Sequence, residues 1–382
     1  MASDLGTGNA DKPTLLRSGH DDFECFDVTC PDDPNKPDHP ELPRASPTRV
    51  HPRDALFDPG EAVATALPVC DHYAGVELRM HKSLALQGEM GPVFDVTLDG
   101  EDGAPVGGEI EHSHLIAELV NGPANRFGRV AARVQPVEHA RFDAVIDLLV
   151  QRCGTKLAHL MIPKVRGAAD VQRAAAAVDE ACHRHGVART IPLHALIETH
   201  GGLADVRAIA LHPRIESLSF GLMDFVSAHR GAIPLAAMGV PGQFEHPLVV
   251  RAKLELAAAC HAAGKTPAHS VVTEFRNSGA IQQAAEQAAR RFGYTRMWSI
   301  HPAQIRPIVE AFAPTVAEVD QAVEVLFAAQ AADWAPIRHH DTLQDRASYR
   351  YFWHVLARAN RTAFSGGPQL PAQVREAFFT PL

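Results

Sequence analysis

The chain has 382 residues, with 36 lysines and arginines against 45 aspartates and glutamates, and a formal net charge of −9. This acidic balance argues against general binding to nucleic acid or anionic membranes, because such partners attract basic surfaces. The amino terminus has no secretory signal pattern, and no stretch reaches the roughly 18 apolar residues of a membrane-spanning helix. We therefore expect a cytoplasmic protein without a nucleic-acid or membrane partner.

Residues 1–65 are predicted to form an extended, proline-rich arm. Eight prolines fall within residues 31–60, a density that opposes regular helix and weakens any sheet ladder. The arm has too few apolar residues to fold alone, and its composition leaves open whether it is disordered or wraps the barrel or another subunit. Within it, Cys25 and Cys30 lack the two-residue gap and the second pair of a zinc ribbon. The six cysteines of the chain are too scattered for a disulfide framework, so we expect reduced thiols.

From residue 66, short apolar runs alternate with amphipathic stretches, which is the order of repeated βα units. The runs, eight in number, cover residues 67–70, 93–99, 130–135, 159–164, 190–198, 215–220, 269–274 and 296–300. A count of eight predicts a TIM-type (β/α)₈ barrel over residues 66–314, although a doubly wound open sheet would show the same alternation.

The segments between the runs carry helical periodicity. Apolar residues recur at helical spacing over 142–149 and again over 171–182, which predicts helices that pack against the sheet. Beyond the eighth unit, residues 315–382 contain helical segments at about 316–332 and 344–359. We expect this part to be a C-terminal helical extension and not another repeat.

Polar residues follow the predicted strands, where the loops of a parallel barrel converge on one mouth. They are Glu101, Asp102, Arg133, Gln135, Lys164, Glu198 and Asp224. Several carboxylates at one mouth repel one another unless a cation or a basic neighbour compensates. Oxygen ligands at strand ends suit Mg²⁺, which retains waters that a substrate displaces. The pattern therefore predicts a magnesium site.

Other signatures are missing or weak. The sequence contains no phosphate-binding GxxxxGK[ST], no GxSxG and no HExxH, and its only dinucleotide-like glycines lack a preceding strand. Two histidine pairs, at 112–114 and 183–185, fall on predicted helices and are expected at the surface. His339, His340 and Asp341 lie in a polar linker as a possible ligand group, and Asp341 is kept as a candidate.

Short motifs in this order resemble the HpcH/HpaI aldolase and citrate lyase family, in particular its citrate lyase β-subunit and malyl-CoA lyase branch. The resemblance covers about residues 65–320. It rests on Lys82 ahead of the second strand, D99-G-E-D, R133-V-Q, I162-P-K-V, I197-E-T, F220-G-L-M-D, I300-H-P-A-Q-I and F312-A-P.

The resemblance implies a TIM barrel that uses Mg²⁺ to cleave or form a carbon–carbon bond, often in an acyl-CoA hydroxy acid such as a malyl-, citramalyl- or citryl-thioester. It implies Glu198 and Asp224 as metal ligands, and Arg133 as the group that binds the substrate carbonyl and carboxylate. Glu101 and Asp102 would be an acidic pair near the metal. We expect Lys82, Gln135 and Lys164 to contribute to substrate binding, and the family suggests a homo-trimer or homo-hexamer.

The sequence departs from the family in its C-terminal segment, which lacks the short Met-Ile-Asp-x-Pro lid that related lyases bring to a neighbour's active site. Asp341 or Asp345 would replace the aspartate of that lid, or no such acid is needed. Two other functions stay open: an aldolase on a free 2-oxo acid without CoA, and a non-catalytic barrel subunit of a larger assembly. Five basic residues are considered for CoA phosphates: Arg79, Lys82, Arg126, Arg129 and Arg166.

Overall fold

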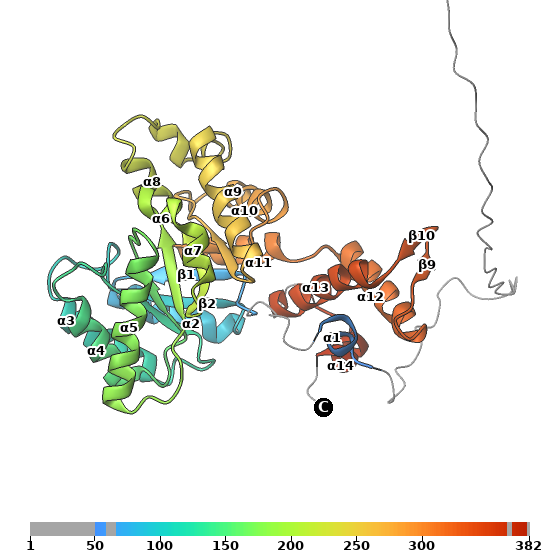
Figure 1. The fold of residues 1–382 in the computed structure, drawn as a ribbon, viewed down its shortest axis with the longest axis horizontal. Helices are drawn as coiled ribbons and strands as arrows, with labels where there is room; N and C mark the ends of the chain where they lie inside the picture. Colours follow the sequence, from blue (N-terminus) through green and yellow to red (C-terminus); the bar gives the residue numbers. More distant parts are fainter. Residues whose placement is uncertain (1–49, 59–65, 365–368, 380–382) are drawn as a thin grey trace, which may run out of the picture. The chain divides into compact units, whose positions relative to one another are not determined.

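The computed structural model describes residues 50–58, 66–364 and 369–379 (Figure 1). The cysteine pair of the arm and most of its prolines lie outside these residues. In the part of the chain that is described, no helix is long and apolar enough to cross a membrane.

A closed barrel of eight parallel strands forms the centre of the fold, with each strand paired to its sequence neighbours and β1 paired to β8. The strands are β1 (Cys70–Ala74), β2 (Phe94–Asp99), β3 (Val130–Arg133), β4 (Leu160–Ile162), β5 (Leu193–Ile197), β6 (Ile215–Phe220), β7 (Thr266–His269) and β8 (Arg296–Ser299). Because pairing of the first and last strands closes the sheet, the barrel prediction is confirmed and the open doubly wound sheet is excluded.

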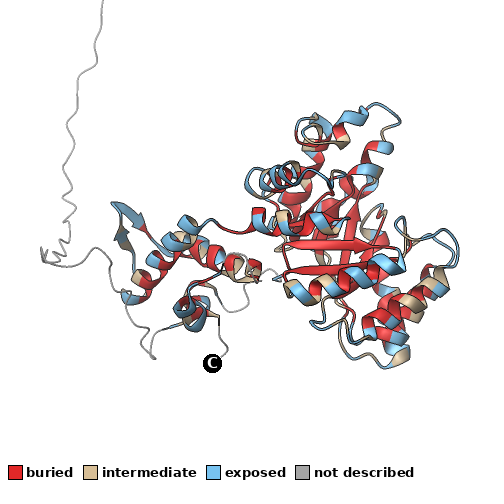
Figure 2. Ribbon diagram, turned by 180° about the vertical axis from the view of Figure 1, so that it is seen from behind, coloured by how far each residue is buried: buried red, intermediate tan, exposed pale blue. Residues whose placement is uncertain are grey.

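Helices connect the strands and cover the outside of the barrel, so that the strands are buried (Figure 2). They are α2 (Glu77–Met90), α3 (Glu109–Asn121), α4 (Phe142–Cys153), α5 (Ala168–His185), α6 (His200–Ala204), α7 (Val206–Leu211), α8 (Leu222–Ser227), η1 (Leu235–Met238), η2 (Gly242–Phe244), α9 (Pro247–Ala262), α10 (Ser278–Arg290) and α11 (Pro302–Phe312). The two periodic stretches lie on α4 and α5, and their apolar residues are buried as expected.

The first strand was placed too early by sequence. It was expected at 67–70, and β1 covers Cys70–Ala74. Polar residues inside the strand hid it, because Asp71 faces the barrel interior, where its carboxylate lies 2.9 Å from the guanidinium of Arg296. An apolar-run criterion does not recognise a strand that buries an ion pair.

The seventh strand was placed too late. It was expected at 269–274, and β7 covers Thr266–His269. The two valines that suggested a strand, Val271 and Val272, follow β7 and are buried in the loop at its carboxyl end. Pro267 inside β7 made the true strand look unfavourable.

The barrel interior is layered. Side chains alternate between interior and exterior along each strand, so residues two apart share the interior at different heights. At the amino-terminal ends of the strands, Arg296 forms ion pairs with Asp71 and Asp95, at 2.9 and 2.7 Å. Above this polar layer lies a buried cluster made of Tyr73, Met161, Leu196, Val271 and Trp298. The layer above that is the mouth, where the strands end.

Buried histidines make the stability of this fold depend on pH. His72 in β1 donates to or accepts from Ser299 Oγ at 2.9 Å, and burial lowers its pKa from 6.5 to about 4. Above pH 6.5 neither the folded nor the unfolded chain protonates this ring. Below pH 6.5 the unfolded chain takes up a proton that the folded chain resists, so the stabilisation present at neutral pH is lost as pH falls toward 4.

We expect His72 alone to lower the free energy of unfolding by about 3 kcal/mol between pH 7 and pH 4. The measurement is urea unfolding at several pH values for the wild type and for His72→Asn. The variant has no imidazole at this position. As pH falls from 7 to 4, the free energy of unfolding of the wild type should therefore decrease by that amount relative to the variant. Parallel pH profiles would contradict the assignment of His72 as a neutral, buried ring.

Residues after the barrel form α12 (Val316–Ala331), a hairpin of β9 (Ile337–His339) and β10 (Thr342–Gln344), α13 (Arg346–Thr362) and α14 (Ala372–Phe378). The two helical segments expected at 316–332 and 344–359 correspond to α12 and α13. The antiparallel hairpin between them was not predicted.

The expectation that prolines prevent helix before residue 60 was wrong at one place. The short helix α1 covers Pro52–Leu56 and begins with its proline at the first helical position, where a missing N–H costs nothing. It packs on α13, and Arg350 Nε donates to the carbonyl of Leu56 at 2.7 Å.

Candidate active site

The mouth of the barrel holds a cavity of about 390 Å³. Its wall includes ends of several strands and the loops that follow them, so residues far apart in sequence meet there. Those with chemistry to offer are Tyr73, Asp99, Asp102, Arg133, Glu198, Asp224 and Trp298. Glu198 and Asp224 also line an adjoining cavity of about 490 Å³, together with Lys164.

Arg133, the last residue of β3, is held rigidly. Its Nε and one terminal nitrogen donate to the two carboxylate oxygens of Asp99 at 2.6 and 2.5 Å, and its other terminal nitrogen lies 3.1 Å from Glu101. The guanidinium also lies 5.5 Å from the ring of Tyr73 and 5.8 Å from that of Trp298. Although burial opposes its charge, the contacts with Asp99 raise the pKa of Arg133 above its usual range.

Asp99 is the positioning residue for this arginine. It ends β2, and its carboxylate also accepts the backbone N–H groups of Glu101 and Gly103 at 3.0 and 2.9 Å. The two hydrogen bonds to Asp99 use two of the five N–H donors of the guanidinium, and the ion pair with Glu101 is a third contact. Arg133 also lines the cavity.

Glu198 follows β5 and is almost entirely buried, at 3% exposure. One of its oxygens accepts the backbone N–H of Lys164 at 2.8 Å. Lys164 adopts a φ of 52°, which is uncommon for a residue other than glycine and indicates a constrained backbone at this point. Burial, and then the negative charge of Asp224, raise the pKa of Glu198 from 4.5 to about 8.

This pair of carboxylates fits a divalent cation. Asp224 lies in the first turn of α8, three residues after Gly221, and its charge adds to that of Glu198. Arg133 and Lys164 make their ion pairs with other carboxylates. Arg79 lines the same cavity but forms no ion pair with Glu198 or Asp224 among the residues that the structure describes. Two carboxylates repel each other here because both are negative and Glu198 is almost entirely buried. A cation would relieve this repulsion, and Mg²⁺ prefers oxygen ligands.

Gly221 lets Glu198 occupy its position. A Cβ at residue 221 would lie 2.1 Å from Glu198 Oε2 and 2.5 Å from Glu198 Cβ, closer than real contacts allow. We expect Gly221→Ala to lower kcat about 100-fold, because it displaces a group at the reacting centre by about an ångström. Gly239→Ala is the matched control, since its Cβ would meet one carbonyl oxygen at 3.6 Å. Equal kcat values for both variants would show that Glu198 is not needed where it lies.

Lys164 organises the predicted acidic pair. Its ammonium group forms an ion pair with Glu101 and lies 3.1 Å from both oxygens of Asp102. Burial raises the pKa of Glu101, although Arg133 and Lys164 oppose this effect. The structure thus brings Glu101, Asp102 and Lys164 together beside Arg133.

Two predicted substrate-binding residues, Gln135 and Lys82, do not line either of the two cavities described above. Gln135 is buried and donates to the carbonyl of Gly100 at 2.6 Å, outside the lining of both mouth cavities. Lys82 lines a neighbouring cavity of about 500 Å³ together with Arg79, which also lines the first mouth cavity.

Of the other basic residues considered for CoA phosphates, Arg166 lines the cavity shared with Lys164 and pairs with Asp170 at 2.9 Å. Arg126 and Arg129 precede β3 and so lie at the opposite end of the barrel from the mouth. They cannot bind a ligand at the mouth of this chain, so that part of the expectation was wrong.

The acidic candidates of the C-terminal segment have local partners. Asp341 is in the turn of the β9–β10 hairpin and pairs with Arg338. Asp345 caps α13, where its carboxylate accepts the N–H groups of Ala347 and Ser348 at 3.0 and 3.3 Å. A capping role explains Asp345 without any catalytic function.

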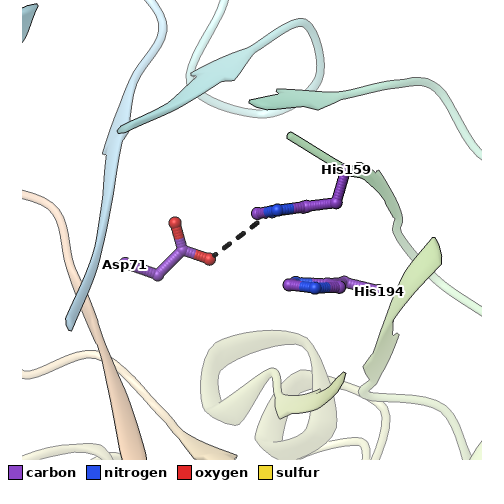
Figure 3. A group of neighbouring side chains, drawn as sticks. All are labelled: Asp71, His159 and His194. Atoms are coloured by element: carbon purple, nitrogen blue, oxygen red, sulfur yellow. Dashed lines mark ion pairs between the residues drawn. The ribbon is translucent and has the colours of Figure 1, made fainter. Parts of the chain in front are cut away.

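A second polar group lies at the amino-terminal end of the barrel, where the side chains of Asp71 in β1, His194 in β5 and His159, the residue before β4, lie close together (Figure 3). The two imidazole rings stack with centroids 3.5 Å apart at an interplanar angle of 13°. Ring nitrogens bind metals within the ring plane, so parallel rings do not direct their lone pairs to one point. Arg296 already pairs with Asp71, so the charge of this carboxylate is balanced within the core. This group is part of the polar core and not a metal site.

Buried carboxylates and a fixed guanidinium at the mouth of a (β/α)₈ barrel define the chain as a barrel enzyme. The sequence model of the family described as HpcH/HpaI aldolase/citrate lyase matches residues 94–302, more than half of the chain. The chain therefore belongs to the HpcH/HpaI aldolase/citrate lyase family and is a carbon–carbon lyase.

Individual relatives with similar sequences are consistent with this family assignment. The crystal structure of a citrate lyase from Burkholderia xenovorans is 50% identical, with a TM-score of 0.74 over 87% of this chain and 99% of that one. The L-malyl-CoA/β-methylmalyl-CoA lyase of Cereibacter sphaeroides is 28% identical over 62% of this chain and 77% of its own length. The CitE protein of Mycobacterium tuberculosis, in complex with magnesium, acetoacetate and coenzyme A, shares the fold at 20% identity, with a TM-score of 0.60 over 77% of this chain and 99% of that one.

Sequence reasoning did not single out Asp99, Tyr73 or Trp298 as site residues. Asp99 belongs to a motif at the end of the second strand. Its spacing could have indicated a role in the site, because it is two residues from Thr97 and four from Asp95, which point into the barrel along β2. The two aromatic residues carry no such signal, because an aromatic residue in a strand is usually core.

Proposed function

We propose that the protein is a Mg²⁺-dependent lyase that cleaves, or forms, a 3-hydroxyacyl-CoA such as a malyl-, citramalyl- or citryl-thioester. The observation that carries the proposal is the shared cavity, which Glu198 and Asp224 line together with Arg133, whose guanidinium is fixed by Asp99. The malyl-CoA lyase relatives and the magnesium and coenzyme A complex of the CitE protein support the choice of substrate and metal.

The proposed cleavage balances as a retro-aldol reaction. The hydroxyl proton is removed, the bond between the hydroxyl-bearing carbon and the carbon next to the thioester breaks, and a 2-oxo acid leaves. The thioester fragment departs as an enolate that then takes up a proton. Glu198 and Asp224 would hold Mg²⁺, which supplies Lewis acidity to the oxygens of the 2-oxo acid.

The residues of the chain supply positioning and proton handling. Arg133, fixed by Asp99, donates hydrogen bonds to the oxygen on which negative charge develops, in a site where it needs no reorganisation. Glu101, beside Arg133, is our candidate for the group that holds the proton, because burial raises its pKa. Lys164 keeps the Glu101 and Asp102 carboxylates in place.

The test is to incubate the protein with a panel of hydroxyacyl-CoA esters and to identify the products. We expect Mg²⁺-dependent release of a 2-oxo acid and acetyl-CoA. Release from free hydroxy acids, with no binding of CoA by calorimetry, would favour the aldolase that uses no thioester. No turnover with either group of compounds would contradict the proposal.

A second reaction to test alongside carbon–carbon cleavage is thioester hydrolysis, because a (3S)-malyl-CoA thioesterase of Cereibacter sphaeroides is 29% identical over 56% of this chain and 62% of its own length. The two reactions differ in the bond that breaks. A lyase releases a 2-oxo acid and an acyl-CoA, whereas a thioesterase releases the intact hydroxy acid and free CoA thiol. Thiol detection in the same assay separates them.

We also propose that the chain forms a homo-trimer or homo-hexamer, as suggested by its family resemblance. Sedimentation equilibrium should give three or six times the 41.3 kDa mass of one chain. The mass of a single chain across the micromolar range would contradict this prediction.

A further inference from the structure

We propose that Glu324, His339 and His340 form a binding site for Zn²⁺, or a similar borderline divalent cation, on the C-terminal extension. This site is separate from the barrel mouth and independent of the proposed lyase activity. One ligand atom from each residue lies within 4.8 Å of the other two. The carboxylate comes from α12 and both imidazoles come from the β9–β10 hairpin, so a bound ion would link two elements of the extension.

The two distances from the carboxylate to the imidazoles match a tetrahedral site, and the two imidazole nitrogens lie within 4.8 Å of each other. Glu324 Oε2 lies 3.1 Å from His339 Nε2 and 3.4 Å from His340 Nε2. Zn²⁺ binds histidine nitrogen and carboxylate oxygen at about 2.1 Å, which places tetrahedral ligand atoms about 3.4 Å apart. The three side chains therefore need little movement to accept an ion, and a fourth position stays open for water.

Ring orientation distinguishes this group from the one inside the barrel. The rings of His339 and His340 are not stacked, with centroids 4.2 Å apart at an interplanar angle of 80°, and both Nε2 atoms lie within 3.4 Å of the same Glu324 oxygen. The rings of His159 and His194, by contrast, are stacked. Both nitrogens near Glu324 are Nε2 atoms, and the exposed carboxylate gives the ion access from solvent.

The backbone of the hairpin is what brings the two neighbouring histidines together. Consecutive side chains in a strand point to opposite faces, yet His340 follows β9 directly and still reaches the same carboxylate as His339. It does so because His340 and Asp341 form the two-residue turn with φ 45° and 59°. Both residues take the positive φ that a two-residue turn of this type requires.

The neighbouring charges favour a cation. Arg338 pairs with Asp341 across the turn and not with Glu324. Mixed nitrogen and oxygen donors select Zn²⁺ over Mg²⁺, which prefers oxygen alone. The two sites of the chain thus differ in the metal they would take.

The test is Zn²⁺ titration of the full-length protein against a chromophoric chelator, in a non-thiol reductant and with Mg²⁺ in excess. The wild type is compared with Glu324→Gln and with the triple variant Glu324→Gln/His339→Asn/His340→Asn. His183→Asn/His185→Asn on α5 is the matched control, because it removes the same number of surface imidazoles. Circular dichroism checks that each variant folds.

We expect the wild type and the control to bind one Zn²⁺ more than the triple variant, and Glu324→Gln to weaken that site at least tenfold. Co²⁺ should give visible d–d absorption of a tetrahedral site in the wild type and lose it in the triple variant. Equal Zn²⁺ stoichiometry and affinity in the wild type and the triple variant would overturn the proposal. So would an equal loss in the control, which would indicate general binding to surface histidines.

Discussion

Arg133→Lys is expected to reduce kcat at least about 100-fold while the protein stays folded. Lysine keeps the positive charge but loses the planar fork that binds both oxygens of Asp99 and still leaves donors for the cavity. Loss of one preorganised donor at a developing negative charge costs about 100- to 1000-fold in other enzymes. Steady-state kinetics on the thioester that proves to be the substrate measures the effect.

Arg173→Lys is the matched control for this substitution. Arg173 also contacts both oxygens of one carboxylate, that of Asp143 at 2.5 and 2.6 Å, and it also lies over an aromatic ring. Its pair is exposed on the outside of the barrel, so we expect unchanged kcat and a stability change below about 1 kcal/mol. If Arg133→Lys behaves like Arg173→Lys, the guanidinium of Arg133 has no special function.

Glu198→Gln is expected to weaken activation by Mg²⁺ more than about 100-fold, a loss greater than that caused by outer residues of metal sites. The amide keeps the size of the side chain and can still accept the N–H of Lys164, so the fold should be preserved. Because the pKa of Glu198 rises from 4.5 to about 8, folding of the metal-free protein near pH 7 requires this carboxylate to take up a proton. The amide removes that cost, so the variant should be more stable without metal. The measurement is kcat as a function of Mg²⁺ concentration, together with thermal unfolding without metal.

Glu180→Gln is the control, because Glu180 is an exposed residue of α5 that pairs with Arg184 at 2.6 Å. It should leave both activation and stability unchanged. A Glu198→Gln enzyme that needs no more Mg²⁺ than the wild type would show that Glu198 is not a ligand.

The repeated units of the barrel were predictable because their signal is local. Helices such as α4 and α5 bury apolar residues at a spacing that any reader of the sequence can count. The predicted strand bounds were wrong where the barrel interior is polar. In β1 the inward Asp71 balances Arg296 of β8, and only closure of the barrel reveals that partner.

The site was predictable to the extent that it lies at strand ends. Glu198, Arg133 and Lys164 follow recognisable strands, and the structure brings them close together. The sequence did not reveal which residues fix their positions. Asp99 binds Arg133 from the neighbouring strand, and Gly221, which has no Cβ, leaves room for Glu198. These contacts between neighbouring strands depend on differences in distance of a few tenths of an ångström, which the spacing of residues in the sequence does not encode.

The central claim is that Glu198 and Asp224 together hold the catalytic metal. The most direct test is a crystal structure with Mn²⁺ in place of Mg²⁺, since the anomalous signal of manganese locates the ion without assumptions. We predict an anomalous peak within coordination distance of both carboxylates, at about 2.0–2.3 Å. A manganese-loaded crystal with no peak between these two side chains would contradict the account.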